Sequence, residues 1–274
     1  MGMELPRRLF SMDLLARRLA QVCPLSSVER DLLLQRQQQP RSYCAGTMIT
    51  DNRFRRSQPK LIVSGWACRE CILGNGRRQL LSILLPGDLI GNWSEERALD
   101  LVEVVAISDV RLIDIAGFLR AIEEDPGRYT GIADGLSALR FSEERRLLDH
   151  MVRLGSQPAL QRIAGFILEL FQRCRVIGFV SGGSFVMPLT QEMVGDALGL
   201  SLVHVNRVMR QLKTNHLIDL HSGIFRIQDL AGLALAAGFS LNDDAQSANG
   251  VNSALANDRD LDRLTLNRPE TISA

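Results

Sequence analysis

The chain has 274 residues, of which 46% are hydrophobic and 23% charged, and its formal net charge at pH 7 is +1. This length allows two domains, and the composition is that of an ordinary globular protein rather than a disordered or fibrous one. No run of about 18 apolar residues offers a membrane span, and the first residues lack the apolar core of a signal peptide. We therefore expect a cytoplasmic protein with no membrane partner.

Five cysteines occur in the chain, and a cytosolic setting favours free thiols over disulfides. Only Cys68 and Cys71 have the spacing of a chelating pair, and they fall in a segment that is predicted to be a strand. Residues three apart on a strand point to opposite faces, which disfavours a shared metal ion. We expect no metal site, and the sequence leaves open whether Cys68 or the other thiols are redox-active.

The N-terminal half is predicted to change from helices to strands. Two short helices are expected at 12–22 and 26–37, with one of the two serines at the start of the second as its N-cap. From about 40 to 115, runs of Val, Ile and Leu are separated by turn residues. This pattern predicts a compact antiparallel β-structure, in which "NG" at 75–76 marks a hairpin and "PGD" at 86–88 a turn.

From residue 116 the pattern becomes helical. A short helix is predicted to end before Pro126, and a long one follows from about 127 to 155. Apolar residues along the long helix step by three and four, with Glu143 at the one seam position that is not apolar, which resembles a two-stranded coiled coil and predicts a homodimer. The alternative is a helix packed on its own domain. The predicted dimerisation residues are Ile132, Leu136, Leu139, Leu147, Met151 and Leu154.

The next segments differ in charge and polarity. A further helix is predicted over 156–175, with Pro158 near its first turn. Residues 155–228 hold seven Lys or Arg against four Asp or Glu, and this mild positive charge suits a module that meets phosphate. The tail at 240–274 is polar and lacks aromatic residues, so we expect it to be disordered.

The stretch 190–218 reads as two short helices joined by a turn at Gly199, followed by a wing of two strands around a Ser-Gly turn. Polar side chains gather at the start of the second helix, where a recognition helix presents its side chains to base edges. The alternative is an ordinary helix pair whose charged face is only solvated. The predicted DNA-binding residues are Thr190, Gln191, Ser201, Val203, His204, Asn206, Arg207, Arg210 and Lys213.

These motifs resemble those of the Crp/Fnr family of bacterial transcription regulators over about 25–239. The resemblance rests on "LLPGDLIG", the long helix, the hairpin "PLTQEMVGDALGLSLVHVNRVMRQLKTNHLI" and "IFRIQD" at the end of the wing. It implies an α+β fold with an N-terminal antiparallel β-roll of the cyclic-nucleotide-binding type, a long dimerisation helix and a C-terminal winged helix-turn-helix. The implied boundaries are an N-terminal extension at 1–24, a sensor domain at 25–125, the dimerisation helix at 126–154, the DNA-binding domain at 155–239 and a tail at 240–274.

The resemblance also assigns roles within the helix hairpin. Arg207 matches the family arginine that contacts guanine, where the guanidinium fork fits O6 and N7. Gln191 falls where the family contacts a backbone phosphate. The family glutamate that accepts from cytosine is replaced by Val203. The half-site should therefore differ from those of well-known members, with His204 and Asn206 as substitute readers and Val203 against a thymine methyl group.

The implied effector pocket of the roll departs more from the family. Members that bind cyclic AMP follow the "GD.IG" turn with a glutamate for the ribose and an Arg-Ser or Arg-Thr pair for the cyclic phosphate. Here Asn92 follows Gly91 at the glutamate position, and Asp100 and Leu101 fall where the pair would lie. Arg97 substitutes only if the loop register shifts. Because a carboxylate repels phosphate, we expect no cyclic nucleotide; the cysteine group of oxygen-sensing members is also missing, so we expect no iron–sulfur cluster.

The sequence predicts a dimeric, sequence-specific transcription regulator that binds double-stranded DNA at a palindromic operator and contacts RNA polymerase if it is an activator. The alternative is an effector-binding or protein-interaction module whose helix hairpin does not bind DNA. An enzyme is not expected, because no nucleophile elbow, phosphate loop or zinc-binding helix is present. The acidic pairs at 95–96 and 143–144 are interpreted as solvated surface.

Overall fold

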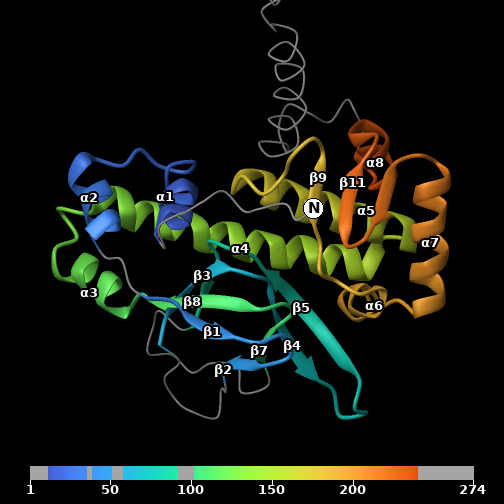
Figure 1. Ribbon diagram of the computed structural model, residues 1–274, viewed down its shortest axis with the longest axis horizontal. Helices are drawn as coiled ribbons and strands as arrows, with labels where there is room; N and C mark the ends of the chain where they lie inside the picture. Colours follow the sequence, from blue (N-terminus) through green and yellow to red (C-terminus); the bar gives the residue numbers. More distant parts are fainter. Residues whose placement is uncertain (1–11, 36–38, 51–57, 92–101, 240–274) are drawn as a thin grey trace, which may run out of the picture. The chain divides into compact units, whose positions relative to one another are not determined.

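The computed structural model describes residues 12–35, 39–50, 58–91 and 102–239 (Figure 1). These residues fall into two compact units, one within 1–157 and 188–205 and the other within 158–187 and 206–274. The predicted domain boundaries stay predictions, and the predicted extension before residue 12 and tail from residue 240 lie outside the described residues. Within the described ranges, no helix combines the length and apolar character needed to cross a bilayer.

Two short helices open the first unit, α1 (Asp13–Leu19) and α2 (Ser27–Gln35). Ser26 caps α2: its hydroxyl accepts the Glu29 backbone N–H at 3.3 Å, and the Glu29 carboxylate accepts the Ser26 N–H at 2.8 Å. This reciprocal pair is a capping box. The prediction of a serine N-cap here is confirmed, and Ser26 is the residue that provides it.

The β-roll consists of two antiparallel sheets of four strands each, in the orders β1-β8-β3-β6 and β2-β7-β4-β5. The strands are β1 (Arg41–Tyr43), β2 (Met48–Thr50), β3 (Lys60–Ser64), β4 (Ala67–Ile72), β5 (Arg78–Leu84), β6 (Leu89–Ile90), β7 (Glu103–Ala106) and β8 (Val110–Asp114). Ile62, Ala67, Leu84 and Leu112 belong to one buried cluster of this roll. Both predicted turns are confirmed, with Gly76 at φ 78° and Gly87 at φ 87°.

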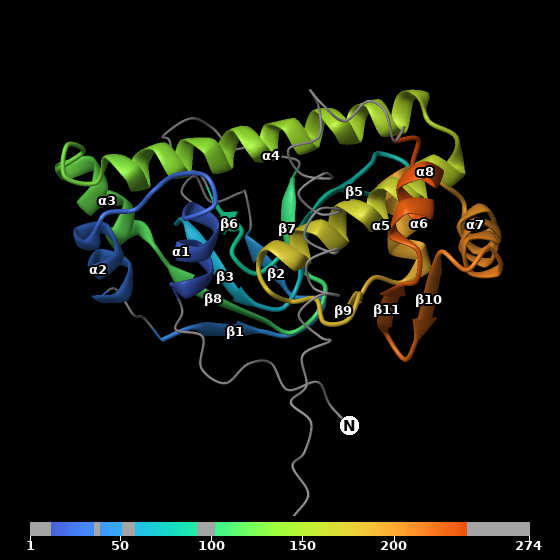
Figure 2. The same ribbon diagram turned by 90° about the horizontal axis from the view of Figure 1, so that it is seen from above.

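Helix α3 (Ala116–Glu124) leads into the long helix α4 (Thr130–Ser156), which runs alongside the roll in both views (Figures 1 and 2). The start of α4 is tied to α2 by Glu29, whose carboxylate also accepts the Ile132 N–H at 2.9 Å. A Cβ at Gly131 would lie 2.8 Å from the Pro24 backbone carbonyl oxygen and 2.9 Å from that carboxylate, so a glycine is needed at this position. The N-terminal end of α4 is thus built into its own unit.

The predicted dimer seam of α4 divides into two halves. Ile132, Leu136 and Leu139 are at most 8% exposed and pack in a core with α1 and α2 residues. Side chains buried this deeply in their own chain offer no surface to a partner, so assigning these three to a dimer contact is wrong. Beyond them, Leu147 is 41% exposed and Met151 67% exposed.

The second unit contains α5 (Ala159–Val176), a three-stranded sheet and α8 (Leu230–Ala236). The sheet order is β10-β11-β9, with β9 (Ser184–Val186), β10 (Ile218–His221) and β11 (Ile224–Ile227), and Figure 2 shows the β10–β11 hairpin clearly. Phe185 packs against Phe171 and Phe225 with ring centroids 5.8 and 5.9 Å apart. The two-stranded wing is confirmed, and β9 and α8 are additions that the sequence interpretation did not contain.

Candidate nucleic-acid interface

The first helix of the hairpin, α6 (Gln191–Leu198), begins and ends as its sequence dictates. The Thr190 hydroxyl accepts the Met193 N–H at 3.2 Å, and Gly199 adopts a left-handed φ of 63°. Gly195 allows the chain to pass closely, because a Cβ there would lie 2.7 Å from the Leu200 carbonyl oxygen. The predicted cap and turn are therefore confirmed.

The second helix, α7 (Leu202–Thr214), presents a strongly two-sided surface. Its predicted stripe of Val205, Val208, Met209 and Leu212 is buried. Every predicted DNA-binding residue is exposed except Gln191, which is half-buried. At the start of α7, Ser201 Oγ accepts the His204 N–H at 3.4 Å and lies 2.7 Å from the ring nitrogen Nδ1. The exposed face of α7 therefore carries both polar side chains and the apolar side chain of Val203.

The end of α7 and the wing share a charged contact. Lys213 Nζ lies 3.3 Å from the Asp219 carboxylate on β10 and donates to the Leu220 carbonyl at 3.3 Å. This lysine therefore also fixes the wing on the helix. The tight wing turn places Ser222 and Gly223 at φ 51° and 78°. Arg226 is exposed on β11 and is a candidate phosphate contact that the sequence interpretation did not name.

Helix α6 is also held from the roll, within the first unit. Arg78 on β5 donates through Nε and Nη2 to the Asp196 carboxylate at 2.9 and 2.7 Å. Gln79 donates to the Ala197 carbonyl at 3.4 Å. No local sequence pattern signals this contact, because its partners lie 118 residues apart. It links the β4–β5 hairpin of the roll to α6, the helix that precedes α7.

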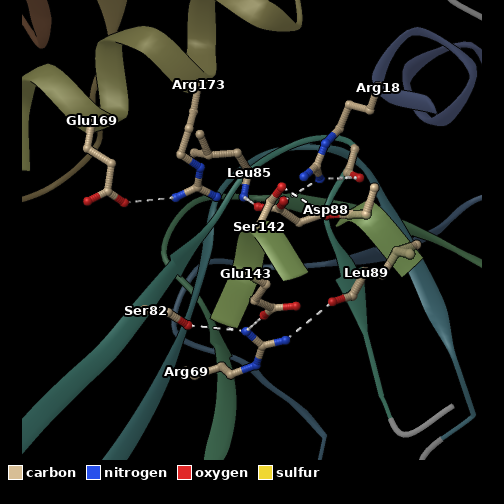
Figure 3. A network of polar contacts seen from close by, with 12 residues as sticks. Arg18, Arg69, Ser82, Leu85, Asp88, Leu89, Ser142, Glu143, Glu169 and Arg173 are labelled. Carbon is tan, nitrogen blue, oxygen red and sulfur yellow. Dashed lines mark hydrogen bonds and ion pairs between the residues drawn. The ribbon is translucent and has the colours of Figure 1, made fainter. Parts of the chain in front are cut away.

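An ion pair crosses from the roll to α4 (Figure 3). Arg69 on β4 pairs with Glu143, and it also donates to the Ser82 hydroxyl at 3.3 Å and the Leu89 carbonyl at 3.4 Å. The interpretation of Glu143 as solvated surface is wrong, because Arg69 holds its carboxylate against the roll. Its side chain is one-third exposed.

The predicted effector pocket is only partly within the described residues. Gly91 adopts a φ of 101°, in the region that favours glycine. Asn92, Arg97, Asp100 and Leu101 lie outside the described residues. Three residues before Gly91, Asp88 in the turn between β5 and β6 pairs with Arg18 of α1, as Figure 3 shows.

Cys68 and Cys71 lie three residues apart on β4 and differ in burial. Cys68 is buried with its sulfur 3.6 Å from the Glu70 carboxylate, whereas Cys71 is half-buried. Burial, followed by the negative charge of Glu70, raises the pKa of the Cys68 thiol to about 12. A thiol that stays protonated is a poor nucleophile and metal ligand. In the part of the chain that the structure describes, no cluster of three or more His, Cys, Asp or Glu is placed to hold a metal ion.

The fold and the hairpin define a winged helix-turn-helix protein with an N-terminal β-roll and a long connecting helix. Residues 161–236 match the family described as the Crp-like helix-turn-helix domain. The nitrogen fixation regulation protein FixK of Azorhizobium caulinodans is 31% identical to this chain over 59% of its residues. FixK of Bradyrhizobium diazoefficiens is 30% identical to this chain over 61% of its residues. The matches cover 64% and 68% of those relatives, so the first falls short of two thirds of its relative's length.

The solved structure of FixK2 from Bradyrhizobium japonicum has a TM-score of 0.61 and 26% identity, covering 73% of this chain and 98% of that one. The transcriptional activator protein FnrL of Cereibacter sphaeroides is 26% identical over 73% of this chain and 80% of its own length. The chain belongs to the Crp/Fnr family of transcription regulators. This membership favours the DNA-binding interpretation over the protein-interaction module, and these relatives are regulators rather than enzymes.

Proposed function

We propose that this chain binds DNA sequence-specifically as a homodimer and regulates transcription from a palindromic operator. The carrying observation is the two-sided helix α7, whose apolar stripe is buried while His204, Asn206 and Arg207 are exposed on its first turns. A recognition helix contacts base edges with its N-terminal residues, and arginine forms a bidentate contact with guanine. Arg207 is the proposed guanine reader, and Val203 is available for a thymine methyl group.

The homodimer is supported by the second half of α4. Phe141, Leu148, Met151 and Val152 are between 55% and 69% exposed, and they recur at intervals of three, four and seven residues. An apolar stripe of this spacing is typical of a helix that packs against another helix. Two copies joined here would carry two recognition helices, and a two-fold symmetric operator is the matching DNA.

We further propose that cyclic AMP does not control this protein through the pocket that the family uses. Asp100 supports this, because it falls at the position of the family's phosphate-binding arginine and its carboxylate would repel a cyclic phosphate. The protein is expected to work in the cytoplasm without a metal or iron–sulfur cofactor, and to contact RNA polymerase if it is an activator.

Selection of bound sequences from random duplex DNA tests the proposed function. We expect the wild type to enrich a palindrome and Arg207→Ala to lose its guanine preference by roughly 5- to 150-fold, since a bidentate pair contributes about 1–3 kcal/mol of discrimination. Arg210→Ala is the matched control, because it removes an equal charge one turn further along α7; it should weaken binding to all sequences alike. If the wild type enriches no sequence, the protein-interaction alternative replaces this proposal.

A further inference from the structure

The first turn of α7 contains a side-chain contact between two predicted DNA-binding residues. Ser201 Oγ lies 2.7 Å from Nδ1 of His204, and the same oxygen accepts the His204 backbone N–H at 3.4 Å. Both residues are exposed. One edge of the imidazole is therefore held by the cap of its own helix, and the opposite edge, which carries Nε2, faces away from that contact.

The Ser201–His204 contact is compatible with either tautomer of the ring, and the arrangement that also uses the hydroxyl hydrogen of Ser201 places the ring proton on Nε2. A hydroxyl has one hydrogen to donate and two lone pairs that accept. Because the His204 backbone N–H already uses a lone pair of Ser201 Oγ, donation of the hydroxyl hydrogen to Nδ1 uses both functions of the serine. A neutral imidazole that accepts at Nδ1 carries its proton on Nε2.

We propose that Ser201 fixes His204 as a hydrogen-bond donor at Nε2 that is directed at an acceptor atom of DNA, an inference that rests on the function proposed above. In the major groove, guanine, adenine and thymine each present an acceptor, whereas cytosine presents only its amino donor. A fixed donor therefore disfavours cytosine on the contacted strand at one position of the half-site. A phosphate oxygen is the other source of acceptor chemistry, and contact there gives affinity without base preference.

The neighbouring side chains do not produce the same selectivity. Val203, which is 77% exposed, has no hydrogen-bonding group. Asn206 carries both a donor and an acceptor, and it can therefore pair with bases of either kind. Arg207 donates only, but its fork is matched to the two acceptors of guanine. Exclusion of cytosine alone, with the other three bases tolerated, is thus the mark of the single donor at His204.

The proton position can be measured directly on the full-length protein without DNA. Nitrogen-15 correlation spectra of the histidine rings at pH 8 distinguish neutral imidazole protonated at Nε2 from that protonated at Nδ1. We expect His204 in the wild type to be the Nε2–H form, and Ser201→Thr, which keeps the hydroxyl, to preserve it. Ser201→Ala should move the ring nitrogen shifts of His204. A wild-type ring protonated at Nδ1 overturns the proposal whether or not the protein binds DNA.

The base preference is then measured by selection from random duplexes with the wild type, His204→Phe, Ser201→Ala and Ser201→Thr. We expect the first two variants to lose the exclusion of cytosine, by roughly two- to tenfold per half-site, which is the effect of one hydrogen bond. Ser201→Thr should retain it. Asp229→Ala is the control for loss of a helix cap, because it removes the side-chain cap of α8, which accepts the Gly232 N–H, without touching His204 or any predicted DNA-binding residue.

Each outcome has one meaning. A loss of affinity that is equal for all sequences in both His204→Phe and Ser201→Ala, but not in Ser201→Thr, supports the fixed donor and assigns it to a phosphate. A motif that the His204 and Ser201 variants bind with wild-type affinity and preference, while Arg207→Ala loses its guanine, overturns the inference and leaves the proposed function intact. Absence of any enriched motif in the wild type overturns both.

Discussion

The two halves of α4 carry the same kind of sequence pattern and have opposite surroundings. In the first half Ile132 and Leu136 are buried among residues of α1, α2 and the roll. In the second half Leu148 and Met151 are mostly exposed. Periodicity therefore identifies the apolar face of a helix but does not tell which partner covers it. Here the first half is covered by its own chain, and the second half is where we propose that another copy packs.

The largest expected effect is on the free energy of unfolding, for a substitution in the buried first half of α4. Leu136→Ala should lower the free energy of unfolding by about 2–5 kcal/mol, because it removes contacts and leaves a cavity in a packed core. Denaturant titration at fixed protein concentration measures this. Leu148→Ala is the matched control, since it removes the same atoms from a side chain that is 55% exposed. In samples dilute enough to be monomeric it should leave the free energy of unfolding almost unchanged. Equal losses for both variants would contradict the division of the helix.

Substitutions in the exposed second half of α4 should change the dissociation constant of the homodimer rather than the stability of the folded chain. Met151→Glu is expected to weaken the homodimer by tenfold or more, because burying a methionine side chain contributes about 1.5–3 kcal/mol and a buried unpaired carboxylate is unfavourable. Sedimentation equilibrium gives the dissociation constant. Leu34→Glu places the same charge on an exposed leucine of α2 and should leave the dimer intact. A wild-type protein that stays monomeric at high concentration would refute the proposed packing.

The role of Glu29 in holding the first half of α4 can be tested by the pH dependence of stability. Burial of Glu29 opposes its ionisation, but hydrogen bonds from Ser26, Ile132 and Gly131 outweigh burial and lower its pKa below the ordinary value of 4.5. A lowered folded-state pKa means that its stabilisation is present above pH 4.5 and is lost as the pH falls through the folded value. Glu29→Gln should cost about 1–3 kcal/mol at pH 7 and much less at low pH. A cost that does not shrink in acid would contradict this role.

The sequence was most informative where the determinants are local. The cap at Thr190, the left-handed turn at Gly199 and the buried stripe from Val205 to Leu212 all depend on residues within one or two helical turns. These features fix the hairpin and its exposed face. The β-character of 40–115 was also predictable, but its pairing order was not, because strands such as β1 and β8 meet across about 70 residues of chain.

The ion pairs that the sequence does not predict join residues that are far apart along the chain. Arg78 meets Asp196 across 118 residues and Arg69 meets Glu143 across 74, and no periodicity or spacing encodes either pair. From sequence alone a charged residue is expected to be solvated, because its ion-pair partner is known only once the fold is known. For this reason the sequence alone places Glu143 on the solvated surface. The same limit applies to the short strand β9, which pairs with β11 about 40 residues further along the chain.

The smallest expected effect lies at the junction of the two halves of α4, where Glu143 pairs with Arg69. A double-mutant cycle with Arg69→Met and Glu143→Gln should give a coupling of about 1 kcal/mol or less, because both side chains are partly exposed and solvent screens the pair. Arg145 and Asp149, an exposed pair on the same helix, are the matched comparison and should couple more weakly still. The Arg69–Glu143 coupling should also fall less in high salt, since partly buried pairs are screened less. If the two pairs couple equally, Glu143 does not fasten α4 to the roll.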